Sequence, residues 1–143
     1  MKFYKLFTTL LFSSLLGGCH LLGDYIPPDE TTTVTKTDNG LCFAVPNAGD
    51  YRPATIRIRP RNSPEGTGFS RLMPALSINK GALCIADSYY SFPPNGDFIV
   101  NYSLRSPTKQ RERRFVVVVF NMVNGEPHLL KPRHDEAPLL HGN

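Results

Sequence analysis

The chain has 143 residues, a length that suits one domain. Its 13 prolines and 11 glycines interrupt short apolar runs, so the composition favours strands and turns over a helical bundle. The formal net charge is +4, but two of the lysines lie in the N-terminal segment described next. The other 14 basic and 12 acidic side chains nearly balance, so charge alone indicates no class of partner.

The N-terminus combines two lysines, a short apolar run and a cysteine. Lys2 and Lys5 precede the apolar run 6–16, and Leu16-Gly17-Gly18-Cys19 follows directly. The run is too short for a permanent membrane-spanning helix, and a buried core helix would show a polar face. Small residues just before a cysteine are what a lipoprotein signal peptidase requires. We therefore predict that residues 1–18 are a removed signal peptide and that Cys19 carries the lipid anchor.

Export determines how the remaining cysteines are interpreted. The chain would fold in an oxidising compartment, where Cys42 and Cys84 remain as an even pair once Cys19 carries lipid. A disulfide between them would stabilise the fold by about 4 kcal/mol on the chain-entropy model. A reactive thiol and a metal site are weaker alternatives, because no cysteine or suitably spaced histidine lies nearby. Since His20 and not an aspartate follows Cys19, we expect an outer-membrane anchor with the domain facing the periplasm.

The segment after the anchor is predicted to be a tether over residues 19–33, because it contains two prolines, several acids and several threonines. The β-branched run Thr31 to Thr37, the turn Asp38-Asn39-Gly40 and the alternating run Leu41 to Val45 predict a hairpin. A third strand is expected over Ala54 to Pro60. In that strand Ile56 and Ile58 point one way while Arg57 and Arg59 point the other.

The middle of the chain predicts a second cysteine strand. A polar, glycine-rich loop over 61–68 leads to an expected strand over Leu72 to Ile78, and Asn79-Lys80-Gly81 turns the chain into a strand over Ala82 to Ala86. In both cysteine strands the large apolar side chains alternate with the cysteine, which shares its face with alanines. Small neighbours would let the two backbones approach closely enough for a disulfide.

Two longer strands are predicted near the C-terminus. Phe98 to Leu104 alternates between apolar and polar side chains, whereas Phe115 to Met122 is apolar on both faces, as in a central strand covered on both sides. Asn124-Gly125 is a hairpin signal. About seven short strands predict an all-β chain with a single β-sandwich domain over residues 34–131, for which an immunoglobulin-like topology is one possibility. Residues 132–143 are expected to be loosely ordered.

The sequence contains no recognisable catalytic or metal-binding motif. Ser70 lies in Gly68-Phe69-Ser70-Arg71, which lacks the second glycine of a nucleophile elbow. The histidines do not have the spacing of a zinc site, and a glycine-rich phosphate loop is missing. His134-Asp135-Glu136 could hold a metal loosely, but a solvated tail explains it better. We therefore predict a binding module that is not an enzyme and needs no metal or cofactor.

Two features compete as the surface that binds a partner, and the first is basic. Arg57 and Arg59 share a strand face, and Arg111 and Arg113 lie in the basic segment 109–114. Such charges could contact an acidic protein surface or lipid phosphates, while export argues against nucleic acid. A solvated face that protects a sheet edge is the alternative interpretation.

The second feature is the aromatic segment 88–97, with Tyr89, Tyr90 and Phe92 ahead of two prolines. Tyrosines on a loop stiffened by proline offer a large contact area at a small cost in entropy, which suits a binding surface. The alternative is that Tyr89 or Tyr90 packs beneath the sandwich as a corner residue.

Several blocks of the sequence together resemble one known family. They are the lipobox at Cys19 and the segments Thr31 to Thr35, Leu41 to Arg61, Leu83 to Pro93, Gly96 to Leu104 and Arg114 to Val119. On these blocks the chain resembles small enterobacterial lipoproteins described as type VI secretion system immunity periplasmic lipoproteins. The likeness covers most of the chain and consists of whole-domain patterns without a catalytic signature. It is weaker in the segment 109–114 and beyond Lys131.

The resemblance implies a protein that waits in the periplasm, anchored to the membrane through Cys19. There it would bind a toxic effector delivered by neighbouring cells and block the active site of that effector or its access to substrate. Such a role requires no catalysis. The runner-up is a structural or accessory lipoprotein of an envelope secretion or assembly system.

Overall fold

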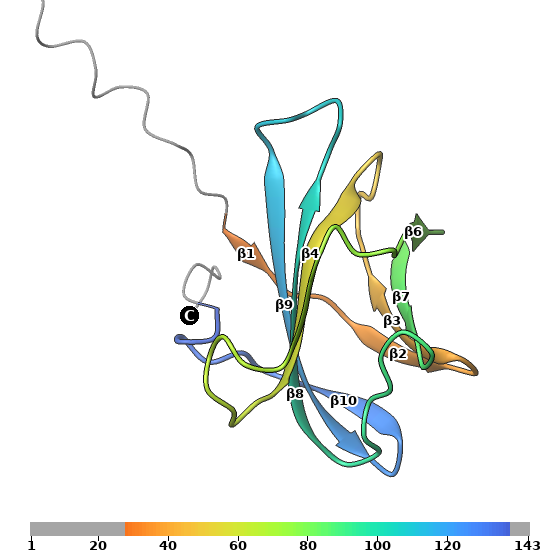
Figure 1. Ribbon diagram of the computed structural model, residues 1–143, viewed down its shortest axis with the longest axis vertical. Helices are drawn as coiled ribbons and strands as arrows, with labels where there is room; N and C mark the ends of the chain where they lie inside the picture. Colours follow the sequence, from red (N-terminus) through yellow and green to blue (C-terminus); the bar gives the residue numbers. More distant parts are fainter. Residues whose placement is uncertain (1–27, 138–143) are drawn as a thin grey trace, which may run out of the picture.

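The computed structural model describes residues 28–137, and within this range the chain is all-β, with two sheets packed against each other (Figure 1). No helix long and apolar enough to cross a membrane is found in this range. The predicted β-sandwich is therefore confirmed. Residues 1–18, Cys19 and the last six residues lie outside the described range.

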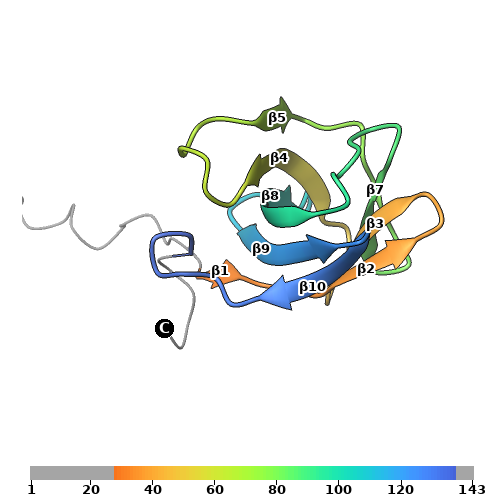
Figure 2. The same ribbon diagram turned by 90° about the horizontal axis from the view of Figure 1, so that it is seen from below.

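The larger sheet has six strands and the smaller has four. The larger sheet has the order β1-β9-β8-β4-β5, with β10 also pairing with β9; its strands are β1 (Asp29–Glu30), β4 (Arg52–Pro60), β5 (Phe69–Leu72), β8 (Gly96–Arg105), β9 (Arg113–Val123) and β10 (Glu126–Leu130). The smaller sheet has the order β2-β3-β7-β6; its strands are β2 (Val34–Thr37), β3 (Gly40–Ala44), β6 (Ile78–Asn79) and β7 (Ala82–Ala86). Figure 2 shows the smaller sheet across one face of the larger one.

The core lies between the two sheets and follows the period-two alternation of the strands. Ile56 and Ile58 of β4 are fully buried, as predicted, and the other long strands contribute every second residue in the same way. The members from β8 and β9 are Phe98, Val100, Tyr102, Leu104, Val116, Val118, Phe120 and Met122. The smaller sheet supplies Leu41, Phe43, Leu83 and Ile85 from its two cysteine strands.

Tight turns connect the predicted hairpins. Lys80 and Gly81 between β6 and β7 both have positive φ, and so do Asn124 and Gly125 between β9 and β10. Positive φ at both central residues matches the right-handed twist of the flanking strands, which is why Asn-Gly is favoured there. Gly40 is required for another reason. A Cβ at this position would lie 2.0 Å from the carbonyl oxygen of Ile85 on the neighbouring strand.

The predicted disulfide is confirmed. Cys42 of β3 and Cys84 of β7 are directly opposite each other, with their Cα atoms 4.0 Å apart. Ala44 and Ala82 form the next pair on the same face of these strands, so small side chains lie beside the bridge as expected. The disulfide joins neighbouring strands of one sheet, whereas the conserved bridge of immunoglobulin domains joins two sheets.

One predicted strand has different bounds in the structure. We expected a strand over Leu72 to Ile78, but β5 spans Phe69–Leu72 and the chain then crosses to the smaller sheet before β6. Met73 has a φ of 46°, which breaks the extended backbone, and Pro74 has no N–H to donate to a sheet. The segment is therefore a connection between sheets.

The two ends of the described chain pack against the domain. Asp29 and Glu30, which we assigned to the tether, pair in parallel with Phe115 and Val116 of β9. In the predicted loose tail, Ala137 is fully buried in a small apolar cluster with Ile99, Val117 and Val119. The domain thus extends beyond 34–131, because the apolar second face of β9 needs a cover that the smaller sheet cannot provide.

Candidate binding surface

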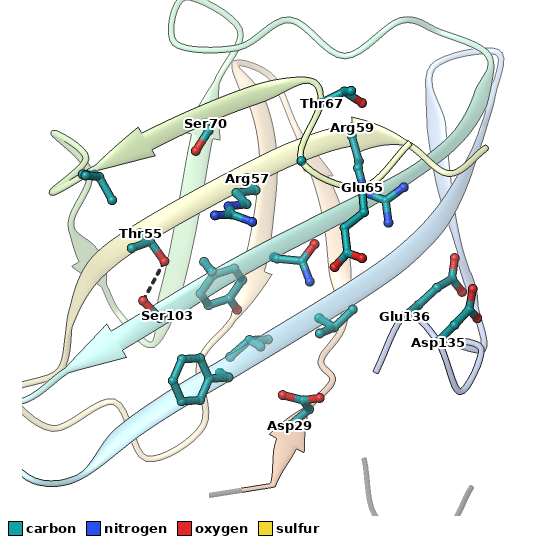
Figure 3. A pocket seen from close by; sticks show the side chains of 17 residues that line it. Asp29, Thr55, Arg57, Arg59, Glu65, Thr67, Ser70, Ser103, Asp135 and Glu136 are labelled. Carbon is teal, nitrogen blue, oxygen red and sulfur yellow. Dashed lines mark hydrogen bonds between the residues drawn. The ribbon is translucent and has the colours of Figure 1, made fainter. Parts of the chain in front are cut away.

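Within the described part of the chain, one face of the larger sheet has no covering layer along most of its width. We call this face, which is turned away from the smaller sheet, the outer face (Figures 2 and 3). Partners across an antiparallel ladder place their side chains on the same side, so the strand register assigns its members. One row runs Leu72, Thr55, Ser103, Phe115, Asp29, and the next runs Ser70, Arg57, Asn101, Val117.

A groove of about 350 Å³ lies over these two rows. Its floor is formed by β4, β8 and β9, and its sides are formed by the 61–68 loop, the 133–137 tail and β1 (Figure 3). Phe115 and Leu72 supply apolar surface, while Arg57 and Asn101 supply donors. The lining is therefore mixed, with a few polar groups among apolar side chains, as in many ligand and partner sites.

Two polar side chains on the groove floor satisfy each other within the sheet. Ser103 is almost fully buried, and its hydroxyl shares a hydrogen bond with the Thr55 hydroxyl 2.7 Å away. A buried hydroxyl without a partner would be costly, and this pairing across β4 and β8 removes that cost. The floor is thus a formed surface that does not need a ligand for its stability.

Arg61 and Glu136 close one side of the groove. The Arg61 guanidinium donates to both carboxylate oxygens of Glu136, at 3.0 and 2.9 Å, and the two side chains are only 10% and 4% exposed. Burial alone would raise the pKa of Glu136, but hydrogen bonds from Arg61 and from the Arg133 backbone hold that pKa below its ordinary value. The same pairing raises the pKa of Arg61. This ion pair fastens the tail to the sheet.

The two arginines predicted on β4 have different roles. Arg59 donates to the backbone carbonyls of Ser63 at 2.8 Å and Arg61 at 3.4 Å, so it supports the 61–68 loop. Arg57 is exposed, and within residues 28–137 it takes part in no ion pair. Of the two, only Arg57 has its charge available to a partner.

The predicted aromatic anchor is mostly engaged with the domain itself. Tyr89, Tyr90 and Phe92 are partly buried and pack against the central core. Phe92 lies 4.8 Å from Tyr90, 5.7 Å from Phe98 and 5.6 Å from Phe120 between ring centroids. This arrangement fits the corner interpretation and leaves less of each ring for a partner.

Arg111 and Arg113 lie far along the sheet, in and beside the connection between β8 and β9, and both are exposed. Asp50 anchors this connection by accepting hydrogen bonds of 2.6 Å from Ser106 and from Thr108. Those bonds lower the pKa of Asp50. The structure does not bring Arg111 and Arg113 together with Arg57 and Arg59, so the basic residues do not form one patch.

No group of three or more histidines, cysteines and acids is placed to hold a metal ion within residues 28–137. Burial raises the pKa of Tyr102 above its ordinary value. Leu72, Asn101 and Phe115 belong to the outer face but were not among the predicted site residues. The alternation within each strand could assign these residues to a face of that strand. Which of them become neighbours depends on the order of the strands in the sheet.

The fold and this surface define a small β-sandwich with a disulfide inside one sheet and an open face on the other. Residues 29–125 match the model of a family described as a domain of unknown function, DUF7480, and the chain belongs to that family. The match runs from β1 to the turn after β9 and therefore includes strands of both sheets. No curated protein and no solved structure matches the chain.

Proposed function

We propose that this protein is a lipoprotein, anchored to the outer membrane through Cys19, that binds and neutralises a type VI secretion effector in the periplasm without catalysis. The sequence supports this proposal through the lipobox and through the resemblance to immunity lipoproteins. The single structural observation that supports it most is the outer face. There a groove of about 350 Å³ is lined by Leu72, which is 80% exposed, and by Arg57, which is exposed and forms no ion pair with another residue in the range 28–137.

Effector binding suits this face for a physical reason. A neutralising protein needs a pre-formed surface, because ordering a loop on binding would reduce affinity. The outer face lies on paired strands, where the Thr55 and Ser103 hydroxyls already share a hydrogen bond, and its mixed apolar and cationic character provides both contact area and selectivity.

The test uses the product of the gene next to this one as the candidate effector. Cells that make this product in the periplasm should be protected by the full chain, and the purified proteins should form a stable complex. The double variant Arg57→Glu, Leu72→Asp should lose protection while keeping its melting temperature. The matched control Arg111→Glu, Val123→Asp changes exposed residues away from the groove and should still protect.

Failure of the parent protein to protect against any neighbouring toxin would overturn the proposal. If deletion of the gene instead disturbed envelope assembly without affecting toxin sensitivity, the structural-lipoprotein role would replace it.

A further inference from the structure

Strand β5 is a free edge of the larger sheet. Figure 2 shows β4 on one side of β5, and no strand within residues 28–137 pairs with its other side. Leu72 pairs with Thr55 and Ser70 pairs with Arg57, and the N–H of Met73 donates to the carbonyl of Ala54 at 2.8 Å. In an antiparallel ladder the hydrogen-bonded pairs alternate. The N–H and C=O groups of Ser70 and Leu72 therefore point away from β4, toward solvent.

The other sheet edges are better protected. Beyond β9 the edge strands are the two-residue β1 and β10, which lies against β2 of the smaller sheet. At one edge of the smaller sheet, β2 carries Lys36, which pairs with Glu126 of β10 at 3.4 Å, and at the other edge β6 has only two residues. A free edge is a template for an additional strand, and β5 is an edge strand of four residues with outward-facing backbone groups and no strand of the other sheet packed beside it in the described chain.

The side chains around β5 specify what such a strand should carry. A residue opposite Ser70 would lie on the outer face about 10 Å from Arg57, two strand spacings away. Because Ser70 is small, the long Arg57 side chain can reach across it to a carboxylate. Opposite Leu72, which is 80% exposed beside the 58% exposed Met73, an apolar side chain would gain burial.

A second copy of this chain fits the edge poorly. In the two-fold antiparallel pairing of β5 with itself that is centred on Arg71, Ser70 would lie opposite Leu72 and the two Arg71 residues would lie directly opposite each other. Like charges at that position are destabilising. Arg71 also donates to the Ser70 carbonyl at 2.8 Å, although this oxygen can accept a second hydrogen bond. The Arg71 charges therefore disfavour self-association in this register, whereas the positive charge of Arg57 favours an acidic partner.

We propose that the free edge of β5 receives an extended segment of the effector as an added antiparallel strand, with an apolar side chain opposite Leu72 and an acidic one opposite Ser70. This inference rests on the proposed function for the identity of the partner. Because an antiparallel strand runs opposite to β5, the segment should read apolar, any residue, acidic, from its N- to its C-terminus.

The probe is the capped peptide Thr-Thr-Leu-Thr-Glu-Thr-Thr, titrated into the full isotope-labelled chain and followed by the amide resonances of Phe69–Leu72. These resonances should shift in a saturable manner. N-methylation of the Glu amide, which faces β5, should weaken binding by about tenfold because one hydrogen bond is lost and the strands clash. N-methylation of the central Thr, whose amide faces away, should change binding by less than about threefold.

Protein variants test the same geometry. Ser70→Pro removes only an outward N–H, so the melting temperature should stay unchanged while binding weakens by about threefold to tenfold. Arg57→Glu should weaken binding by about fivefold, and a peptide with Lys in place of Glu should restore it. The matched control Arg111→Glu reverses an exposed arginine away from β5 and should bind both peptides as the parent does.

The outcomes separate this inference from the proposed function. If the effector complex forms and survives both Ser70→Pro and Arg57→Glu, the β5 edge is not the binding site, while the immunity role stands. A concentration-dependent dimer that Ser70→Pro abolishes would show that the occupant is a second copy. Equal binding of the two N-methylated peptides would also overturn the added strand.

Discussion

At the scale of single residues, the ion pair between Arg61 and Glu136 holds the tail at one side of the groove. Both side chains are nearly buried, and the guanidinium contacts both carboxylate oxygens. A bidentate pair of this kind is specific in geometry, and removal of one partner leaves the other charge buried without compensation. The same pair also holds the tail over the apolar cluster of Val117 and Val119.

Replacing Glu136 with Gln should lower the free energy of unfolding at pH 7 by about 1–3 kcal/mol. Because the folded-state pKa of Glu136 is lowered, its contribution is present above the unfolded value of about 4.3 and is lost as pH falls through the folded value. The difference between parent and variant should therefore shrink on acidification. Urea unfolding at pH 7 and at about pH 3 measures this.

Glu112→Gln is the control for Glu136→Gln. Glu112 pairs with Lys109 at 3.9 Å with both side chains more than half exposed, so its loss should change stability by less than about 0.5 kcal/mol. Equal effects of the two variants at both pH values would contradict the structural role of Glu136.

At the same scale, Phe92 joins the aromatic loop to the core. Phe92→Ala should lower the free energy of unfolding by about 2–4 kcal/mol, because contacts with Tyr90, Phe98 and Phe120 are lost. Ser91→Ala, an exposed change in the same loop, should be nearly neutral. Denaturant midpoints measure both. A Phe92→Ala variant as stable as the parent, but unable to bind the effector, would favour the original interpretation of the ring as a binding anchor.

At the scale of elements, the disulfide joins the two strands at the centre of the smaller sheet. Each of these strands has only five residues, and their sheet has two short edge strands. A sheet of this size buries little apolar surface. A covalent link between β3 and β7 stabilises it because the link reduces the conformational entropy of the unfolded chain, and it also fixes the register of the two strands.

The double variant Cys42→Ala, Cys84→Ala should lower the free energy of unfolding by about 2–4 kcal/mol, on the loop-entropy account of a disulfide. Adding a reductant to the parent protein should produce a similar loss, and should leave the variant unchanged. Thermal unfolding with and without reductant measures this. If the parent protein showed two free thiols when isolated from the periplasm, the predicted loss would have no basis.

At the scale of the whole molecule, the domain is expected to work close to a membrane. Cys19 lies nine residues before the first described residue, so the anchor would be near the N-terminal end of β1 along the chain. Strand β1 lies beside β9 at one end of the large sheet, whereas the free edge of β5 lies at the other. This order places the proposed partner site away from the anchored edge.

Cys19→Ala should abolish incorporation of a radiolabelled fatty acid, because no thiol remains to accept the lipid. The variant should also move from the membrane fraction to the soluble or unprocessed fraction. Ser14→Ala, a change within the expected signal peptide, should still be labelled. Label on the Cys19→Ala protein would contradict the assignment of the lipid anchor.

Local patterns in the sequence were enough to predict much of this molecule. Alternation with period two assigned Ile56 and Ile58 to the core and Arg57 to the outer face, since neighbouring side chains on a strand must point to opposite faces. The disulfide and the Asn124-Gly125 turn could also be predicted. Only cysteines form a disulfide, and few residue types other than Gly and Asn readily adopt the positive φ of such a turn.

Only the tertiary structure decided which strands become neighbours and which edge stays free. The parallel pairing of β1 with β9 and the burial of Ala137 join segments far apart in sequence, and no local pattern records such contacts. A four-residue strand such as β5 shows too little alternation to be recognised, yet its position exposes Leu72. The sequence alone thus determined the two faces of most strands, while strand order determined the groove and the open edge, because these depend on long-range packing.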